Sequence, residues 1–212
     1  MSGYDERLEI YLSSIADEDD PFLERLEAEA LADDVPVIRK DVQRMLRFLL
    51  ALHKPGTILE IGTAVGFSSV FFCRHSGASV VTIENFERRI ACAEKNIAAS
   101  GFSDRITLLK GDAEEILPRL CGPFDMVFLD AAQGQYIHFL PDLLRLLRCG
   151  GLLAADNVMI GGDLLESHYA VARRKRTIHK RMREYLCAVM KGEGLATTVL
   201  PVGDGLALTV KQ

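Results

Sequence analysis

The stretch Leu59-Glu60-Ile61-Gly62-Thr63-Ala64-Val65-Gly66-Phe67-Ser68 decides the fold. It joins a short apolar run to a segment of helical length through a loop that contains two glycines. At the carboxyl end of a strand, such a loop lets the backbone approach a ligand closely. Its GxxxG spacing lacks the GxGxxG pattern, and no Gly-Lys-Ser/Thr follows it. The pattern therefore argues against a dinucleotide-dependent dehydrogenase and against a Walker nucleotide site.

The chain around this loop alternates short apolar runs with amphipathic segments. We expect strands at 57–61, 79–84, 105–109, 124–130 and 151–156, and helices at 67–76, 86–100, 112–120 and 135–148. This alternation predicts βαβ units, and hence an α/β fold with a doubly wound parallel sheet. Residues 4–15, 21–34 and 36–53 show helical spacing and form an N-terminal helical extension, with Pro21 and Pro36 placed at helix starts.

The C-terminal segment does not continue the alternation of strands and helices. A long polar helix is expected at about 167–191, followed by two strand-like runs at 195–200 and 206–210 around Gly203-Asp204-Gly205. This arrangement indicates a hairpin, so the sheet should end with an antiparallel strand. No repeat or linker divides the chain. We expect a single domain over 1–212, with helices in 1–54 and the α/β core in 55–212.

Composition limits the class of protein. The 212 residues are 49% hydrophobic and 26% charged, which is typical of a globular chain. Residues 1–34 carry a net charge of −10 and the remainder +5, so the overall −5 does not exclude an anionic partner. The five cysteines are scattered without a CxxC pair, which favours a reducing cytoplasm. No apolar run is long enough to span a bilayer, and no membrane partner is expected.

Acidic residues at strand ends point to a methyl donor. Glu60 precedes Gly62, where it would repel a phosphate and suit an ammonium or sulfonium group. Glu84 ends the second strand, 22 residues beyond Gly62, and is placed to hold ribose hydroxyls. A positively charged nucleoside without phosphates fits both acids, and S-adenosylmethionine is such a molecule. Gly111 and Asp112 end the third strand, where Asp112 either faces the adenine or caps the next helix.

The next two strand ends carry oxygen ligands. Asp130 ends the fourth strand, and Asp156 and Asn157 end the fifth. These strands should be neighbours in a doubly wound sheet, so the three side chains should converge. Singly, each is typical of a turn. Together, without His or Cys, they favour Mg²⁺ or another divalent cation, which would lower the pKa of a bound hydroxyl.

Seven basic residues lie within eleven positions of the expected C-terminal helix, with no acid between them. They are Arg173, Arg174, Lys175, Arg176, Lys180, Arg181 and Arg183. A solvated helical face is one interpretation. Because the segment follows Asp156 and Asn157, the other interpretation is an RNA-binding patch at the rim of the site. The target would be a base in a single-stranded anticodon.

Six motifs occur along the chain in the order found in one enzyme family: LEIGTAVGFSS, VTIE, GDAEE, FLDAAQGQY, AADNV and PVGDGLAL. From about residue 36 to 210, the chain resembles the cation-dependent class I O-methyltransferases, which include catechol and caffeoyl-CoA O-methyltransferases. Within that group, VPVIRK, DAAxGQY, RRKR…KRMREY and PVGDGLAL most resemble bacterial tRNA 5-hydroxyuridine methyltransferases.

The resemblance implies a Rossmann-like, seven-stranded sheet with an antiparallel last strand, commonly in a homodimer. It implies metal binding by Asp130, Asp156 and Asn157. It also implies a set of residues around the methyl donor: Ile38, Glu60, Gly62, Ser68, Glu84, Asp112, Ala113 and Asp130. Only the resemblance supplies Ile38 and Ser68 to this set.

One position departs from the family pattern. Relatives usually carry a Lys, as general base, three residues after the first metal-binding Asp, and here that residue is Gln133. Gln133 cannot take a proton, so it would orient the acceptor and not deprotonate it. The expected catalytic residues are Asp130 and Gln133. A hydroxyl on an electron-poor uracil is more acidic than a catechol. The favoured substrate is therefore 5-hydroxyuridine at the tRNA wobble position. The alternatives are a small catechol or phenol, and a catalytically weak protein that binds S-adenosylmethionine.

Overall fold

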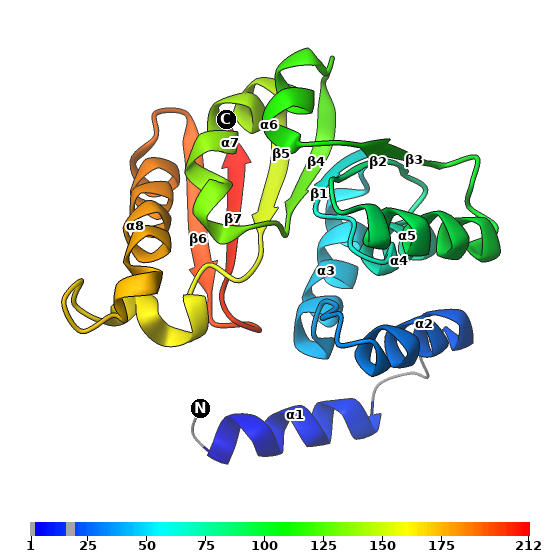
Figure 1. Ribbon diagram of the computed structural model, residues 1–212, viewed down its shortest axis with the longest axis horizontal. Helices are drawn as coiled ribbons and strands as arrows, with labels where there is room; N and C mark the ends of the chain where they lie inside the picture. Colours follow the sequence, from blue (N-terminus) through cyan, green and yellow to red (C-terminus); the bar gives the residue numbers. More distant parts are fainter. Residues whose placement is uncertain (1–2, 16–19) are drawn as a thin grey trace.

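The computed structural model describes residues 3–15 and 20–212, and its centre is a seven-stranded sheet (Figure 1). The strands are β1 (Thr57–Ile61), β2 (Ser79–Glu84), β3 (Ile106–Lys110), β4 (Phe124–Leu129), β5 (Leu147–Ala155), β6 (Leu195–Leu200) and β7 (Leu206–Lys211). Their order is β3-β2-β1-β4-β5-β7-β6. Strands β1 to β5 pair in parallel, whereas β7 is antiparallel to β5 and β6. The predicted doubly wound sheet with an antiparallel last strand is confirmed.

Eight α-helices accompany the strands in the described ranges. They are α1 (Gly3–Ile15), α2 (Pro21–Ala32), α3 (Lys40–His53), α4 (Phe67–His75), α5 (Glu87–Ser100), α6 (Ala113–Ile116), α7 (Tyr136–Leu146) and α8 (Arg176–Lys191). Four short 3-10 segments complete the set: η1 (Leu117–Arg119), η2 (Gln133–Gln135), η3 (Ile160–Leu165) and η4 (Arg173–Lys175). Within the described residues, no helix is long and apolar enough to cross a membrane.

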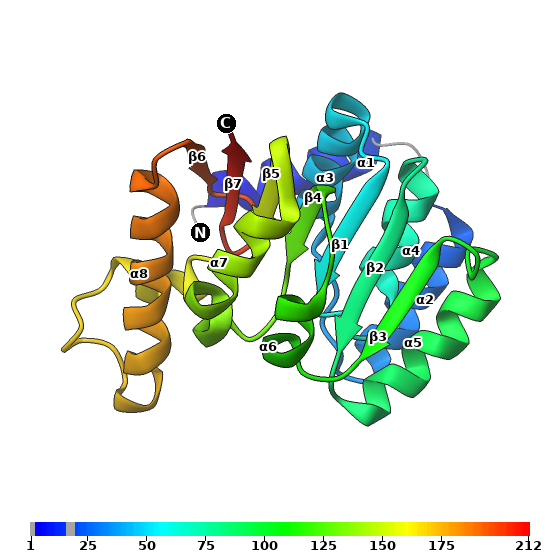
Figure 2. The same cartoon turned by 90° about the horizontal axis from the view of Figure 1, so that it is seen from above.

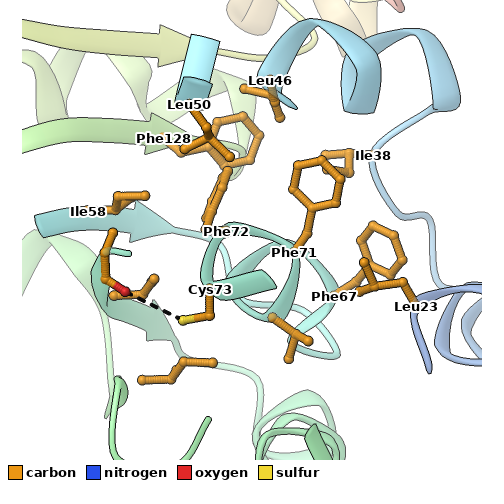
Figure 3. Packing of buried hydrophobic residues seen from close by; sticks show 14 of the residues in the cluster. Leu23, Ile38, Leu46, Leu50, Ile58, Phe67, Phe71, Phe72, Cys73 and Phe128 are labelled. Atoms are coloured by element: carbon orange, nitrogen blue, oxygen red, sulfur yellow. Dashed lines mark hydrogen bonds between the residues drawn. The ribbon is translucent and has the colours of Figure 1, made fainter. Parts of the chain in front are cut away.

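Each face of the sheet carries its own hydrophobic core, because neighbouring strand residues point to opposite faces. Ile58 of β1 packs into the core covered by α2 to α5, while Leu59 packs into the core covered by α6 to α8. Figure 2 shows the sheet between these layers. In the first core, Phe72 of α4 meets Phe128 of β4 edge to face, with ring centroids 5.3 Å apart (Figure 3). Helix α4 is thereby fixed directly behind the glycine loop.

Of the two helix starts predicted at prolines, one is confirmed and one is wrong. Pro21 does begin α2, and the side chain of Asp20 caps that helix by accepting from the N–H groups of Phe22 and Leu23. Pro36 does not begin a helix, because α3 starts only at Lys40. Residues 36–39 have no regular secondary structure, and Ile38 is buried. This connection brings Ile38 to the ligand cavity described below.

The predicted helix over 167–191 is wrong in its first part. Helix α8 begins at Arg176, and η3 and η4 occupy part of the preceding chain. The Arg176 guanidinium donates to the carbonyl oxygens of Val171 and Tyr169, and these contacts hold the preceding segment in a loop. Figure 2 shows α8 at the edge of the sheet, beside β6. Strand β5 also starts earlier than predicted, at Leu147, which pairs with Phe124 ahead of a register shift.

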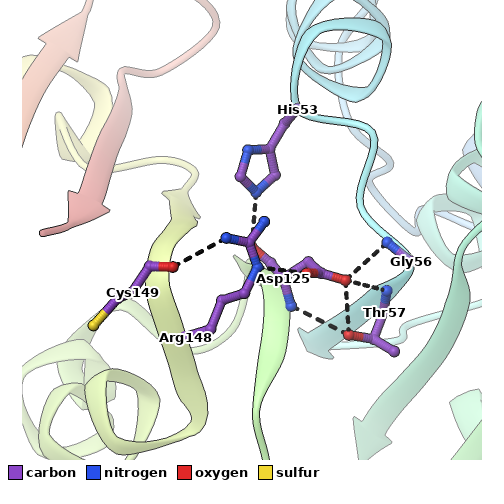
Figure 4. A network of polar contacts seen from close by, with 6 residues as sticks. All are labelled: His53, Gly56, Thr57, Asp125, Arg148 and Cys149. Atoms are coloured by element: carbon purple, nitrogen blue, oxygen red, sulfur yellow. Dashed lines mark hydrogen bonds and ion pairs between the residues drawn. The ribbon is translucent and has the colours of Figure 1, made fainter.

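The end of the sheet opposite the ligand cavity is tied together by Asp125 (Figure 4). One carboxylate oxygen accepts hydrogen bonds from the N–H groups of Gly56 and Thr57, at 2.8 and 2.9 Å, and the other accepts from Arg148. Burial opposes ionisation here. The bonds from Arg148, Thr57 and Gly56 outweigh it and lower the pKa of Asp125 from 3.8 to about 2. Asp125 therefore joins β1, β4 and β5.

Replacing Asp125 by Asn should lower the free energy of unfolding by about 1–3 kcal/mol at pH 7, because backbone donors lose a charged acceptor. The pKa of Asp125 is lowered in the folded chain, so its stabilisation is complete above pH 3.8 and is lost as the pH falls toward 2. Urea unfolding at several pH values measures this. Asp142→Asn is the matched control, since Asp142 is similarly exposed and, among the described residues, its carboxylate is bonded to the Arg145 guanidinium alone. Equal losses in the two variants would contradict the role of Asp125.

Candidate functional site

A cavity of about 490 Å³ lies at the carboxyl ends of β1, β2, β3 and β4. Eight of the nine residues predicted to surround the methyl donor line it: Ile38, Gly62, Ser68, Glu84, Gly111, Asp112, Ala113 and Asp130. Because parallel strands end at one edge of the sheet, residues from distant parts of the sequence meet there. We call this space the donor cavity.

The glycine loop forms one wall of the donor cavity. Gly62, Ala64 and Gly66 all have positive φ angles, at 101°, 47° and 86°. A Cβ atom at Gly62 would overlap the backbone carbonyl of Asp130. Glycine is therefore required there for two reasons, the backbone conformation and the close approach of β4. The contact places the loop directly against the residue that ends β4.

Glu84 holds this loop from the end of β2. Its Oε2 accepts from the N–H of Ala64 at 2.9 Å, and its Oε1 accepts from the N–H groups of Asn85 and Phe86, both at 3.0 Å. Oε2 can accept a further hydrogen bond, because only one of its two lone pairs is used. Glu84 is thus fixed in position at the cavity wall and retains capacity for ligand hydroxyls.

Glu60 is not on the cavity surface, which corrects the expectation that it faces the ligand. It is fully buried, and its Oε2 accepts hydrogen bonds from Ser69 of α4 and Thr82 of β2. Alternation along β1 turns it toward α4. Burial raises the pKa of Glu60 from 4.5 to about 7, against the lowering effect of its hydroxyl partners, which include Ser68. Glu60 therefore lies beneath the cavity, where it links β1, β2 and α4.

Asp112 and Arg89 also line the donor cavity. Asp112 both lines it and caps α6, by accepting from the N–H of Glu114 at 2.9 Å, so the two interpretations of this residue are compatible. Sequence reasoning missed Arg89, in the first turn of α5, which lines the cavity and whose charge lowers the pKa of Asp130. Its position just after Glu84 was the available signal.

Asp130, Asp156 and Asn157 converge as the sequence predicted. The Asn157 amide Nδ2 donates to Asp130 Oδ1 at 3.0 Å, and the Asn157 backbone N–H donates to Asp156 Oδ1 at 2.7 Å. Burial raises the pKa of Asp130, and burial together with the charge of Asp130 raises the pKa of Asp156 to about 7. The buried Tyr136 hydroxyl donates to the backbone carbonyl of Asp156 and fixes this strand end.

This donor set fits a divalent cation. Burial raises the pKa of both carboxyl groups, and the charge of Asp130 further raises that of Asp156, so a cation bound between them would favour their ionised forms. No group of three or more His, Cys, Asp or Glu side chains suited to a metal occurs among the described residues. The amide oxygen of Asn157 would therefore have to join the two carboxylates. Carboxylate and amide oxygens are hard ligands, which suit Mg²⁺ or a similar ion.

A second, more open pocket of about 510 Å³ adjoins the first, and we call it the acceptor pocket. It is lined by Ala131, Ala132, Gln133, Gly134, Gln135, Asn157, Ile178 and Arg181. Ala131, Ala132 and Gln135 also line the donor cavity, so one short loop after β4 separates the two spaces. Gln133 donates through Nε2 to the backbone carbonyl of Asn157 at 2.7 Å, which leaves its Oε1 as an acceptor.

The basic residues predicted to bind RNA do not form one continuous helical face. Arg173 and Arg174 are exposed in or beside η4, and Lys175 forms an ion pair with Asp163 at 2.7 Å. Arg176 is engaged with backbone carbonyls, and Lys180 pairs with Glu184. Arg181 lines the acceptor pocket, and Arg183 is exposed on α8. RNA binding by these residues stays a prediction.

The chain is similar to known O-methyltransferases in sequence and in fold. A family model described as "O-methyltransferase" matches residues 13–212. The catechol O-methyltransferase of Mycobacterium tuberculosis is 34% identical, covering 96% of this chain and 94% of its own. A putative caffeoyl-CoA O-methyltransferase from Staphylococcus aureus has a TM-score of 0.87 at 29% identity, with 98% of both chains covered. A Bacillus cereus O-methyltransferase in complex with SAH has a TM-score of 0.86 at 25% identity, with 97% of both chains covered.

Replacing Gly62 by Ala should cost at least about 3 kcal/mol of unfolding free energy, because a methyl group meets backbone and φ is positive. S-adenosylhomocysteine binding should weaken strongly as the glycine loop shifts. Gly77→Ala is the control, since a Cβ atom at Gly77 meets nothing within 4 Å. Chemical denaturation and calorimetric titration measure both effects. Wild-type stability and affinity in Gly62→Ala would contradict the close approach.

Proposed function

The chain belongs to the O-methyltransferase family and is an S-adenosylmethionine-dependent O-methyltransferase, and from this premise we propose that it methylates an acidic ring hydroxyl with the help of a divalent cation. The observation that carries the proposal is the shared loop after β4. This loop borders the donor cavity on one side and the acceptor pocket on the other. Asp130 begins it, beside Asp156 and Asn157.

The chain contributes to transfer mainly by positioning. Glu84 is held rigidly by three backbone N–H groups and is available to ligand hydroxyls. Asp130 lines the donor cavity and would also hold the cation, so it would stand where the two reacting partners meet. Orienting both partners removes much of the entropic barrier to reaction.

Asp130, Asp156 and Asn157 would hold the cation. When bound, a divalent cation lowers the pKa of a hydroxyl close to it and orients its oxygen. Asp156, with a pKa of about 7, would lose its proton to become a ligand. Tyr136 keeps the backbone of Asp156 in place through its hydroxyl. The chain thus presents two negative side chains at the point where the acceptor hydroxyl must ionise.

The acceptor pocket has no side chain suited to act as general base. Its lining contains neither Lys nor His, and the Arg181 guanidinium does not lose a proton in proteins. Gln133 can accept a hydrogen bond from the acceptor through Oε1 but cannot remove the proton. The site therefore favours a hydroxyl that is already acidic.

We propose 5-hydroxyuridine of tRNA, at the wobble position, as the first acceptor to test. The lack of a general base among the residues that line the acceptor pocket supports it, since an electron-poor uracil makes its hydroxyl acidic. The exposed Arg173 and Arg174 would be free to meet phosphates. A small catechol is the second candidate, because a relative that is 34% identical is named catechol O-methyltransferase.

Transfer of a labelled methyl group to three acceptors distinguishes these candidates. Purified protein with Mg²⁺ would be given unmethylated tRNA that carries 5-hydroxyuridine, the same tRNA without the hydroxyl, and catechol. Label only in the first tRNA supports the tRNA activity, and label only in catechol supports the small-molecule activity. No label in any acceptor, at full S-adenosylmethionine binding, would overturn the proposed function.

Magnesium should raise the melting temperature, and the rise should be larger at pH 8 than at pH 6. The pKa of Asp156 is raised from 3.8 to about 7 in the folded chain, so without metal the fold loses stability as the pH rises through this range. Deprotonated Asp156 both repels Asp130 and binds the cation. Thermal unfolding measures the effect. Asp156→Asn should remove most of the shift while Asp142→Asn keeps it, and an equal shift in both would count against this site.

Replacing Gln133 by Lys should raise kcat/KM for catechol by about ten- to a hundredfold, because a positioned base accelerates deprotonation. Gln133→Met is the control for the lost hydrogen bond to Asn157, since Met has similar length but no amine. Initial rates over a range of catechol concentrations would decide. Similar rates for the Lys and Met variants would show that the missing base does not limit the reaction.

A further inference from the structure

Arg181 places a guanidinium group in the acceptor pocket. It lies on α8, one turn beyond Ile178, and both side chains line the pocket. Its Nη1 donates to the backbone carbonyl of Gly134 at 3.2 Å, which fixes the side chain against η2. A guanidinium has five N–H donors, so most of its hydrogen-bonding capacity remains for a ligand.

The charge of Arg181 has no counterion within the described part of the chain. Its neighbours differ in this respect. Lys180 pairs with Glu184, one turn further along α8, and Lys175 pairs with Asp163. Arg181 has only the neutral carbonyl of Gly134. It is partly buried, and a partly buried cation without a carboxylate gains more from an anionic ligand than a solvated one does.

The rest of the acceptor pocket suits a flat ring. Ile178 supplies an apolar surface, and the small residues Ala131, Ala132 and Gly134 leave room beside it. Gln133, which also lines the pocket, offers a hydrogen-bond acceptor. Among the lining residues, Arg181 alone carries a charge. The pocket therefore combines space for a ring with one positive group.

We propose that Arg181 is a specificity-determining residue that binds an anionic group on the acceptor, next to the ring that carries the methylated hydroxyl. This inference rests on the proposed function, and it narrows the substrate class to acceptors with a fixed negative charge. Such a charge can come from the phosphate of a nucleotide or from the carboxylate of a hydroxylated aromatic acid. A guanidinium pairs with either group through parallel N–H donors.

Two matched pairs of acceptors test the proposal. One pair is 5-hydroxyuridine 5′-monophosphate against the 5-hydroxyuridine nucleoside, and the other is 3,4-dihydroxybenzoate against catechol. With wild-type protein, kcat/KM for the charged member of at least one pair should be about tenfold higher or more, as a charge-assisted hydrogen bond supplies. Preference within the nucleotide pair identifies phosphate, and preference within the aromatic pair identifies carboxylate.

The variants assign this preference to Arg181. In Arg181→Gln the ratio between charged and neutral acceptors should fall close to one, and in Arg181→Lys it should be intermediate, because the charge remains without the planar fork. Lys191→Gln removes the same charge from the exposed end of α8 and should keep the wild-type ratio. An unchanged melting temperature and unchanged S-adenosylhomocysteine binding would show that the Arg181 variants are folded.

Equal kcat/KM within both pairs, or a ratio that Arg181→Gln leaves intact, would overturn the proposal. Its failure is distinct from failure of the proposed function, in which none of the acceptors is methylated. In that case calorimetric titration of the same pairs into protein with S-adenosylhomocysteine and Mg²⁺ still decides. Tighter binding of a charged member that is lost in Arg181→Gln supports the anion site, and equal binding overturns it.

Discussion

The contact between Gly62 and the backbone carbonyl of Asp130 is the constraint on which the site depends. No side chain fits between the two strand ends, so the glycine loop after β1 lies directly against the residue that ends β4. The loop after β1 shapes the donor cavity, and the loop after β4 separates it from the acceptor pocket. A larger residue at position 62 would move these loops apart and would separate the two reacting groups, whose relative position determines the rate.

The electrostatics of the site follow from this close packing. Glu60, Asp130 and Asp156 are all buried or nearly so, and burial raises each of their pKa values. The positive charge of Arg89 partly offsets the effect of burial on the pKa of Asp130. Ligands with positive charge relieve the remaining repulsion. A sulfonium donor and a divalent cation are both of that kind, so the energetic cost of gathering these acids in the folded chain is offset when the ligands of the proposed reaction bind.

Periodicity was sufficient to predict most of the sheet, because strands buried on both faces read as short apolar runs between helices. Strands β1, β2 and β6 have the boundaries expected from the sequence. The start of α8 could not be predicted, since it depends on contacts between the Arg176 side chain and backbone carbonyls of the preceding loop. The position of Glu60 beneath the cavity required knowing that α4 lies against that face of β1. The resemblance to O-methyltransferases is confirmed, whereas the tRNA subgroup and the homodimer stay predictions.

The two halves of the site are built from different kinds of structure, and this explains why the donor was easier to infer than the acceptor. The donor cavity is formed by strand ends whose positions the sheet fixes, and its residues stand at predictable points in the sequence. The acceptor pocket is formed by η2 and α8, which meet through Arg181 and the carbonyl of Gly134. A side-chain change in either element, on the surface that lines the pocket, alters which acceptor fits without disturbing the sheet. The side chains of Gln133, Ile178 and Arg181 are therefore the ones expected to determine substrate choice.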